Sequence, residues 1–137
     1  MINLLISVIY LFATFTITCI CYKKYGRIGL FIWMCVSTII CNIQTIKMID
    51  VLGMTTSLGN ISYGAIFLTT DILSEKYGEK ETRKAIIFSF YTLIIFTLSM
   101  ILFLKYIPSS IDSTNDALKV VFNYLPRITI ASLINCI

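Results

Sequence analysis

The feature that most constrains this chain is a series of long apolar stretches that carry almost no charge. Residues 2–22, INLLISVIYLFATFTITCICY, contain no charged side chain. As a helix rising about 1.5 Å per residue, this stretch is long enough to cross the roughly 30 Å of hydrocarbon in a bilayer. The whole chain is 58% hydrophobic and 13% charged, a balance that is rare in soluble domains of this length. The sequence therefore predicts an all-α, polytopic membrane protein.

The apolar stretches predict a single transmembrane domain over residues 1–137. We expect four complete spans and the start of a fifth, at residues 2–22, 28–49, 53–77, 85–104 and 126–137. A cleaved signal peptide is the alternative for the first stretch, but such a peptide carries basic residues before a shorter apolar core. Gly78 suits the end of the third helix, and residues 117–125 suit a short surface helix or a solvated linker.

The last predicted helix is too short to cross a membrane. It begins at Pro126, a residue that suits a first helical turn, and rises only about 18 Å. A helix that ends inside the bilayer leaves its last carbonyl groups without partners. The segment is therefore either re-entrant or the start of a span in a truncated product, and we expect truncation.

Basic residues predict the orientation. Seven of the eleven lysines and arginines lie in or beside two loops, one after the first span and one after the third: Lys23, Lys24, Arg27, Lys76, Lys80, Arg83 and Lys84. The positive-inside rule places both loops in the cytoplasm, and hence the N-terminus outside the inner (cell) membrane. The net charge of +4 comes from these flanks and forms no basic stripe, so we expect a lipid bilayer and not nucleic acid as the partner.

The residue types that carry most catalysis and metal binding are missing or badly spaced. The chain has no histidine, and its five cysteines lie in apolar segments without a CxxC pair. Zinc and haem sites need such ligands at defined spacing, and general bases are most often histidine. We therefore expect no enzyme activity, no catalytic residue, no metal site and no cofactor.

A polar line follows one face of the third predicted span. At about 100° per residue, the side chains of this line fall within roughly one third of the helix circumference: Gly53, Ser57, Asn60, Gly64, Phe67, Asp71 and Glu75. In a bilayer, such a line must face protein or a water-filled cavity. It therefore predicts a solute pathway.

Several polar residues have two interpretations. Asn42 lies deep in the second span and needs a hydrogen-bonding partner, which is either another helix or a ligand. Asp71 and Glu75 are either binding or gating groups, or interfacial carboxylates paired with Lys76, Arg83 or Lys84.

Two separated elements resemble the VUT family, the queuosine precursor transporters. The first is LGNISYGAIFLTTDILSEKYGEKETRKAI and the second, later in the chain, is LPRITIASL, with Arg127, Ala131 and Ser132. Asn42 also resembles an asparagine of the family, and the likeness covers roughly residues 35–135. It implies an inner-membrane carrier of six or so helices for 7-deazaguanines such as preQ0 and preQ1, related in fold to the substrate-binding subunits of energy-coupling-factor transporters. Family members continue beyond the second element, which agrees with truncation.

The predicted binding set combines the polar line with the family elements. A deazaguanine presents N–H donors that a carboxylate accepts and an oxygen that an amide satisfies, and aromatic rings cover its faces. We expect Asp71 or Glu75 as the acceptor, Asn42 and Asn60 as the amides, and Phe67 or Tyr63 as the stacking ring. Arg127 completes the set, although the predicted topology puts it more than about 20 Å from Asp71, so one small ligand would not contact both.

Three functions remain open from the sequence. The leading one is a transporter that imports queuosine precursors. The others are the substrate-binding subunit of an energy-coupling-factor type transporter and an inactive membrane fragment. The first helix weakens the subunit hypothesis, because it carries only Ala13 where a stripe of alanines would allow close packing. A homo-oligomer is also left open.

Overall fold

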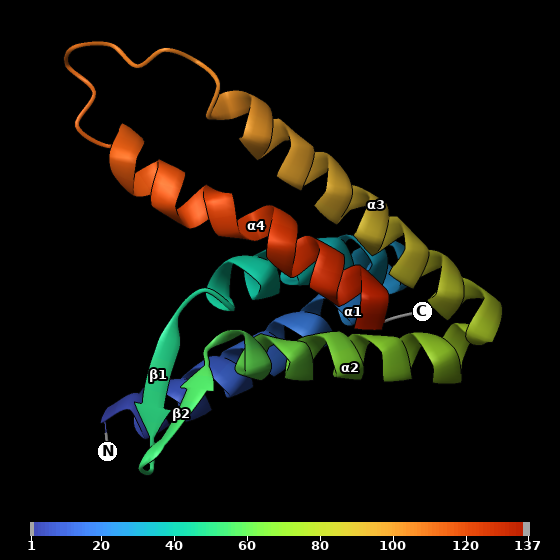
Figure 1. Cartoon of the computed structure of the whole chain (residues 1–137). Coiled ribbons are helices and arrows are strands. Elements are labelled where there is room, and N and C mark those ends of the chain that lie inside the picture. The colour runs from blue at the N-terminus through green and yellow to red at the C-terminus, as the bar shows by residue number, and fades with distance from the viewer. Residues whose placement is uncertain (1, 136–137) are drawn as a thin grey trace.

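The computed structural model describes residues 2–135, and within them it consists of four helices and one small hairpin (Figure 1). The helices are α1 (Ile2–Gln44), α2 (Gly59–Tyr77), α3 (Glu79–Phe103) and α4 (Asn115–Asn135), and the strands are β1 (Met48–Val51) and β2 (Met54–Ser57). The helical class that the sequence predicts is confirmed. The hairpin is an addition that the sequence analysis missed.

α1 consists of two helical arms that fold back on each other at Gly26. This residue has φ 57° and ψ −131°, which a side chain would disfavour, and it ends the regular helix between arms 2–25 and 27–44. The arms are held together by hydrogen bonds across the fold: Trp33 Nε1 donates to Thr18 Oγ1 at 2.8 Å, and Gln44 Nε2 donates to the Tyr10 hydroxyl at 3.1 Å. The prediction of two helical segments that meet near residues 23–27 is confirmed.

Residues 48–57 form a hairpin where the sequence analysis predicted helix. β1 and β2 are antiparallel, with Met48 opposite Ser57 and Val51 opposite Met54. The two turn residues, Leu52 and Gly53, both have positive φ, as a type I′ turn requires. The predicted second span therefore ends at Gln44 and not at residue 49. The third helix begins at Gly59 and not at residue 53.

The turn between α2 and α3 agrees with the prediction that Gly78 ends the third helix. Gly78 has φ 85°, and its N–H donates to the Ser74 carbonyl at 3.1 Å. α3 then starts at once, at Glu79, so the charged segment EKETRKA belongs to the helix and does not form a loop before residue 85. The start predicted for this helix was six residues late.

α4 is one continuous helix that contains Pro126. The sequence predicts a short surface helix or a solvated linker at 117–125 and a new helix start at Pro126, and the single helix contradicts both forms of this prediction. A proline removes only one hydrogen bond of the helical ladder, and the residues on both sides of it continue the same helix. The stretch Asn115–Ile134 is long and apolar enough to cross a membrane. The predicted helix at 126–137 is therefore, in its described part, the second half of a longer helix.

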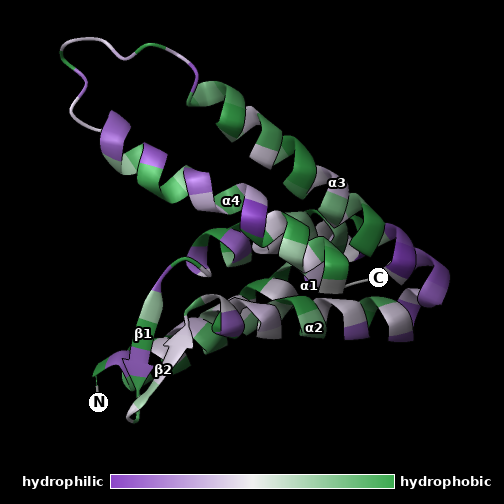
Figure 2. Cartoon of the chain, viewed as in Figure 1, coloured by the Kyte–Doolittle hydropathy of each residue, from purple (hydrophilic) through white to green (hydrophobic). Residues whose placement is uncertain are grey.

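Three of the described helices, α1, α3 and α4, are long and apolar enough to cross a membrane, whereas α2 does not meet that criterion. Figure 2 shows hydrophobic residues along these helices and hydrophilic residues at the turn between α2 and α3. Small polar side chains occupy the interior between helices, among them Thr18, Ser62, Thr69 and Ser89. They share the interior with a few large apolar side chains such as Leu30, Leu73 and Leu93, while many other large apolar side chains face outward, as expected when the surroundings are lipid.

Candidate functional site

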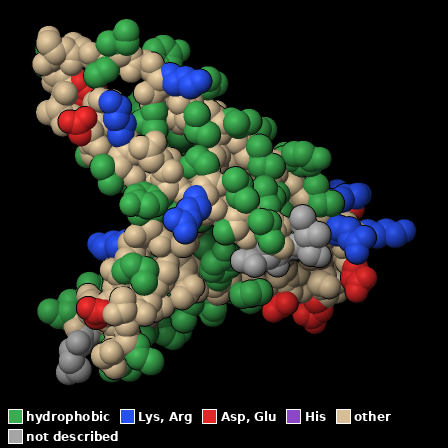
Figure 3. Space-filling model, in the orientation of Figure 1, with side chains coloured by type: hydrophobic (Ala, Val, Ile, Leu, Met, Phe, Trp, Pro, Cys, Tyr) green, Lys and Arg blue, Asp and Glu red, His purple; other side chains and the backbone are tan. Residues whose placement is uncertain are grey.

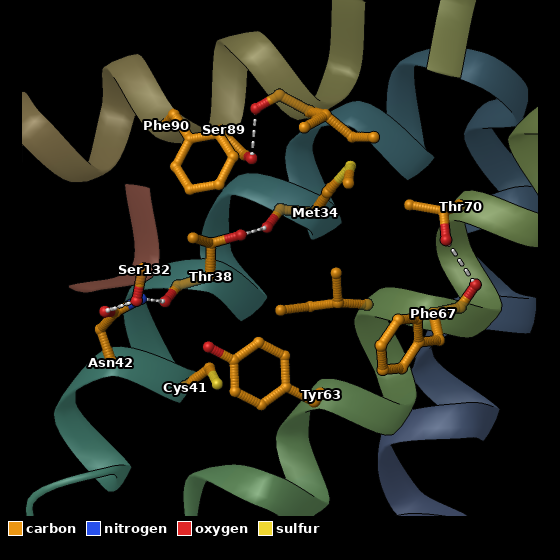
Figure 4. A pocket seen from close by; sticks show the side chains of 12 residues that line it. Met34, Thr38, Cys41, Asn42, Tyr63, Phe67, Thr70, Ser89, Phe90 and Ser132 are labelled. Carbon is orange, nitrogen blue, oxygen red and sulfur yellow. Dashed lines mark hydrogen bonds between the residues drawn. The ribbon is translucent and has the colours of Figure 1, made fainter. Parts of the chain in front are cut away.

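A cavity of about 280 Å³ lies where the second arm of α1, α2, α3 and α4 meet (Figure 4). Its walls are largely apolar and aromatic, with a few hydroxyl groups and one amide. The lining residues are Met34, Thr38, Cys41 and Asn42 from α1; Tyr63, Ile66, Phe67 and Thr70 from α2; Ile86, Ser89 and Phe90 from α3; and Ser132 from α4.

Asn42 is the most polar group in this cavity. Its side chain is only 3% exposed. Its Nδ2 donates to the Thr38 carbonyl at 2.8 Å, one helical turn away, and its Oδ1 accepts a bond from Ser132 Oγ at 3.2 Å. A side-chain amide has two N–H donors and two lone pairs on its oxygen. One donor and one lone pair of Asn42 are thus still available to a ligand.

The contact of Asn42 with Ser132 depends on how the helices cross. Ser132 comes from the last part of α4, which packs against α1, and Figure 4 shows the two side chains pointing toward each other at one end of the cavity. This pairing answers the question that the sequence left open, because Asn42 bonds to another helix and also faces a cavity. The two interpretations of Asn42 are therefore compatible.

Aromatic rings line the rest of the cavity. Tyr63 and Phe67, one turn apart on α2, have ring centroids 6.5 Å apart and planes inclined by 37°. Phe90 enters from α3, on a different side of the cavity (Figure 4). Rings on more than one side can cover the faces of a flat heterocycle.

The position of α2 against α1 depends on Gly59. A Cβ at this residue would lie 2.9 Å from the Cys41 carbonyl oxygen and 2.3 Å from Thr45 Oγ1, so the backbones approach more closely than any side chain allows. Cys41 Sγ donates to the Gly59 carbonyl at 3.4 Å in the same place. This close crossing positions Tyr63 and Phe67 relative to Asn42.

A second hollow, of about 640 Å³, lies between the cavity and the charged end of the molecule. It is more polar than the cavity, and its walls include Ser74, Glu79, Thr82 and Arg83. Both hollows are lined by Ile86 and Phe90 of α3. These two side chains therefore lie at the boundary between the cavity and a charged vestibule.

The structure brings two of the predicted site residues together and leaves four apart. Asn42 and Phe67 both line the cavity, as does Tyr63. The others do not line it, and each has an exposed side chain: Asn60, Asp71, Glu75 and Arg127. Asn60 donates to Thr56 Oγ1 at 2.9 Å. Among the described residues, the remaining three form no ion pair.

The polar line predicted along the third span does not border the interior as expected. Its first members, Gly53 and Ser57, belong to the hairpin. On α2 itself, the buried face carries Ser62, Ala65 and Thr69, whereas Asn60, Asp71 and Glu75 of the line are exposed. Small side chains allow close packing between helices, whereas carboxylates and an amide remain outside. Of this line, only Phe67 reaches the cavity.

Sequence reasoning missed several lining residues. Thr70, Ser89 and Phe90 belong to helix faces that look ordinary in the sequence. Ser132 carried a signal, because it lies in the family element with Arg127 and Ala131, yet only the arginine was selected. The other indication in the sequence was that Asn42, as a buried amide, needs a hydrogen-bonding partner such as Ser132.

Comparisons with known proteins point to a family of transporters. The family described as "Putative vitamin uptake transporter" matches residues 57–137. A relative from Bacillus subtilis (strain 168), "Probable queuosine precursor transporter", is 42% identical over 120 residues, which are 88% of this chain and 52% of the relative. The chain thus spans about half the length of this curated relative. No solved structure matches this chain significantly.

The matched residues include α2, α3 and α4, that is, three of the four helices that form the cavity. Together with the apolar helices, the match identifies a multi-pass membrane protein of a transporter family and not an enzyme. These matches confirm the resemblance to the VUT family, and the chain therefore belongs to the vitamin uptake transporter family.

Proposed function

We propose that this protein imports queuosine precursors, 7-deazaguanine bases such as preQ0 and preQ1, and that the cavity around Asn42 binds them. The observation that carries the proposal is a buried amide, paired with Ser132, in an otherwise apolar and aromatic cavity. The named function of the Bacillus subtilis relative supports the choice of substrate. The cavity volume of about 280 Å³ is near the lower end of the range for small-molecule sites, which suits a compact bicyclic base.

The free groups of Asn42 match the edge of such a base. A 7-deazaguanine carries an N–H beside a carbonyl oxygen in its six-membered ring. The remaining lone pair of Asn42 Oδ1 accepts the ring N–H, and the remaining N–H of Nδ2 donates to the adjacent carbonyl oxygen. Two parallel hydrogen bonds fix the orientation of the base. In an apolar cavity they also discriminate strongly against analogues that leave either partner unpaired.

The walls of the cavity complement the faces of the base. Tyr63 and Phe67 from α2 and Phe90 from α3 offer π surfaces, and stacking on such rings contributes about 1–3 kcal/mol per base. Thr38, Thr70 and Ser89 add hydroxyl groups for the exocyclic substituents. Binding would need no metal, no covalent step and no cofactor.

The charged vestibule provides the route on the cytoplasmic side. The positive-inside rule assigns the basic end of the bundle to the cytoplasm, and the vestibule opens there next to Arg83 and Glu79. A base that leaves the cavity would pass between Ile86 and Phe90.

The exposed members of the predicted binding set take part in the pathway outside the cavity. Asp71 lies one turn beyond Phe67 on the same face of α2, and Glu75 follows one turn later. Asn60 lies toward the hairpin end of the same face. Arg127 is exposed in the middle of a helix long enough to span the membrane. A lone cation facing lipid there is costly, so its side of α4 faces water, substrate or other protein.

The experiment that tests this proposal uses bacteria that cannot synthesise queuosine precursors. The cells express the protein, receive preQ0 or preQ1 at low external concentration, and their tRNA is assayed for queuosine. We expect the protein to raise queuosine well above the empty-vector level and Asn42→Leu to abolish the rise.

The Bacillus subtilis relative serves as the positive control, and immunoblotting of membranes shows that both variants are present. If the relative restores queuosine and this protein does not, import by this chain is disproved. If Asn42→Leu restores queuosine as well as the wild type, the cavity is not the binding site.

A further inference from the structure

A groove of about 330 Å³ runs along the outside of the bundle, between the second arm of α1 and the beginning of α3. We name it the basic groove, after the two cations at its charged end, Arg27 and Lys84. Its floor is made of isoleucine and phenylalanine side chains. It is separate from the cavity around Asn42, with which it shares no lining residue.

The two cations are held at the groove by one carboxylate. Arg27 Nη1 lies 3.1 Å from Glu81 Oε2, and Lys84 Nζ lies 2.7 Å from Glu81 Oε1. The side chain of Arg27 is 53% exposed and that of Lys84 is 68% exposed, whereas that of Glu81 is only 20% exposed. The group therefore has a net positive charge, and its unused N–H donors face outward.

The floor of the groove is unusually exposed for apolar side chains. Ile28 is 65% exposed, Ile32 is 61% exposed and Phe88 is 58% exposed. All three lie on helices that are long and apolar enough to cross a membrane, on the membrane side of the cations. The groove thus has fixed positive charge at the interface and an apolar strip that leads away from it.

This order of groups is complementary to a phospholipid with an anionic headgroup. Further basic side chains, Lys80 and Arg83, lie near the same helix end, and Figure 3 shows blue side chains gathered at the charged end of the molecule. Basic pockets between helices on the cytoplasmic side are typical sites for anionic headgroups. A free phosphate would leave the apolar floor uncovered.

We propose that the basic groove binds one anionic phospholipid of the phosphatidylglycerol type. Its phosphate contacts Arg27 and Lys84, and one acyl chain lies along Ile28, Ile32 and Phe88. The lipid joins the turn of α1 to α3. This site does not depend on which solute the protein transports.

Native mass spectrometry of the purified full chain tests the site. The protein in detergent is mixed with equal amounts of phosphatidylglycerol and phosphatidylcholine that carry the same acyl chains. The detergent is then removed in the spectrometer, and the number of molecules of each lipid that stay bound to the protein is measured. With one net positive charge at the groove, we expect phosphatidylglycerol to be retained about fivefold over phosphatidylcholine. The double variant Arg27→Gln/Lys84→Gln should lose this preference.

A matched control removes the same charge elsewhere. Lys105→Gln/Lys119→Gln neutralises two exposed cations, one just after α3 and one in α4, and should keep the preference. Ile32→Trp keeps both cations and fills the groove, and should lower retention of phosphatidylglycerol even if the double variant folds poorly. Equal retention of both lipids by the wild type overturns the proposal, as does an equal loss in the two double variants.

Discussion

Gly59 provides the sharpest test of the helix crossing that forms the cavity. In Gly59→Ala the new methyl group would lie 2.9 Å from the Cys41 carbonyl oxygen and 2.3 Å from Thr45 Oγ1. The Thr45 hydroxyl can rotate away only by giving up its bond to the Cys41 carbonyl, at 2.8 Å, which costs about 1 kcal/mol. The backbone contact persists after that rotation, and overpacking of this kind costs about 1–3 kcal/mol. We therefore expect Gly59→Ala to lower the free energy of unfolding by about 2–4 kcal/mol.

Gly64→Ala is the matched control on the same helix. Its methyl group would lie 3.2 Å from Leu11 Cδ1, the flexible end of a side chain, and 3.6 Å from Phe15 Cε1. Alanine also favours the helix by up to about 1 kcal/mol over glycine, so the net change should stay within about 1 kcal/mol.

The assay for both variants is unfolding by sodium dodecyl sulfate in mixed micelles, followed by the fluorescence of Trp33. This is the single tryptophan of the chain, and it bonds across the two arms of α1. Equal stabilities of the two variants, or a Gly59→Ala variant as stable as the wild type, would refute the close crossing of α1 and α2.

Three further predictions concern the pathway and the loop before α4. Ile86→Phe should slow import several-fold by narrowing the boundary between cavity and vestibule, whereas Ile87→Phe, which changes the vestibule alone, should leave the rate nearly unchanged; equal rates would contradict the route. Asp71→Asn should lower import without weakening equilibrium binding, and unchanged import would leave Asp71 as an interfacial charge. Hydrogen bonds from the amide and hydroxyl of Thr114 hold the pKa of Asp112 below its usual value of about 3.9. The stability that these hydrogen bonds contribute is fully present above the usual pKa of Asp112 and is lost as the pH falls through its lower pKa in the folded protein. Hydrogen exchange should therefore show the protection factor of the Thr114 amide falling in that acidic range and staying constant from about pH 5 to 8.

Much of the helical architecture could be predicted because apolar stretches report directly on membrane-length helices. The two arms of α1 and the end of α2 at Gly78 follow from charge placement and from a glycine at a helix end. The hairpin at residues 48–57 was missed because its strands are short and apolar enough to extend the neighbouring helical pattern. Pro126 was misread because a first-turn proline and an interior proline look the same in a sequence.

The candidate site was predicted only in part, for a physical reason. Periodicity shows which residues share a face of α2, but it does not show which face packs inward. In lipid, helices associate through small residues. The face of α2 with Ser62 and Thr69 is therefore buried, whereas Asp71 and Glu75 are exposed. Asn42 could be singled out from the sequence because a buried amide must have partners, and it lines the cavity. Its partner Ser132 lies 90 residues away, a distance that no local pattern spans.

Recognition of a 7-deazaguanine depends on two hydrogen bonds from the Asn42 side chain to the ring N–H and the adjacent carbonyl oxygen of the base. Equilibrium binding of radiolabelled preQ1 to the purified protein in lipid nanodiscs tests this most directly. We predict saturable binding by the wild type. Asn42→Leu should weaken it by about 1–3 kcal/mol, which is roughly 5- to 150-fold in Kd. An analogue methylated on the ring N–H should compete at least tenfold less well than guanine-type bases that retain it. Binding of preQ1 with equal affinity by Asn42→Leu and wild type, or equal competition by the methylated analogue, would contradict the account.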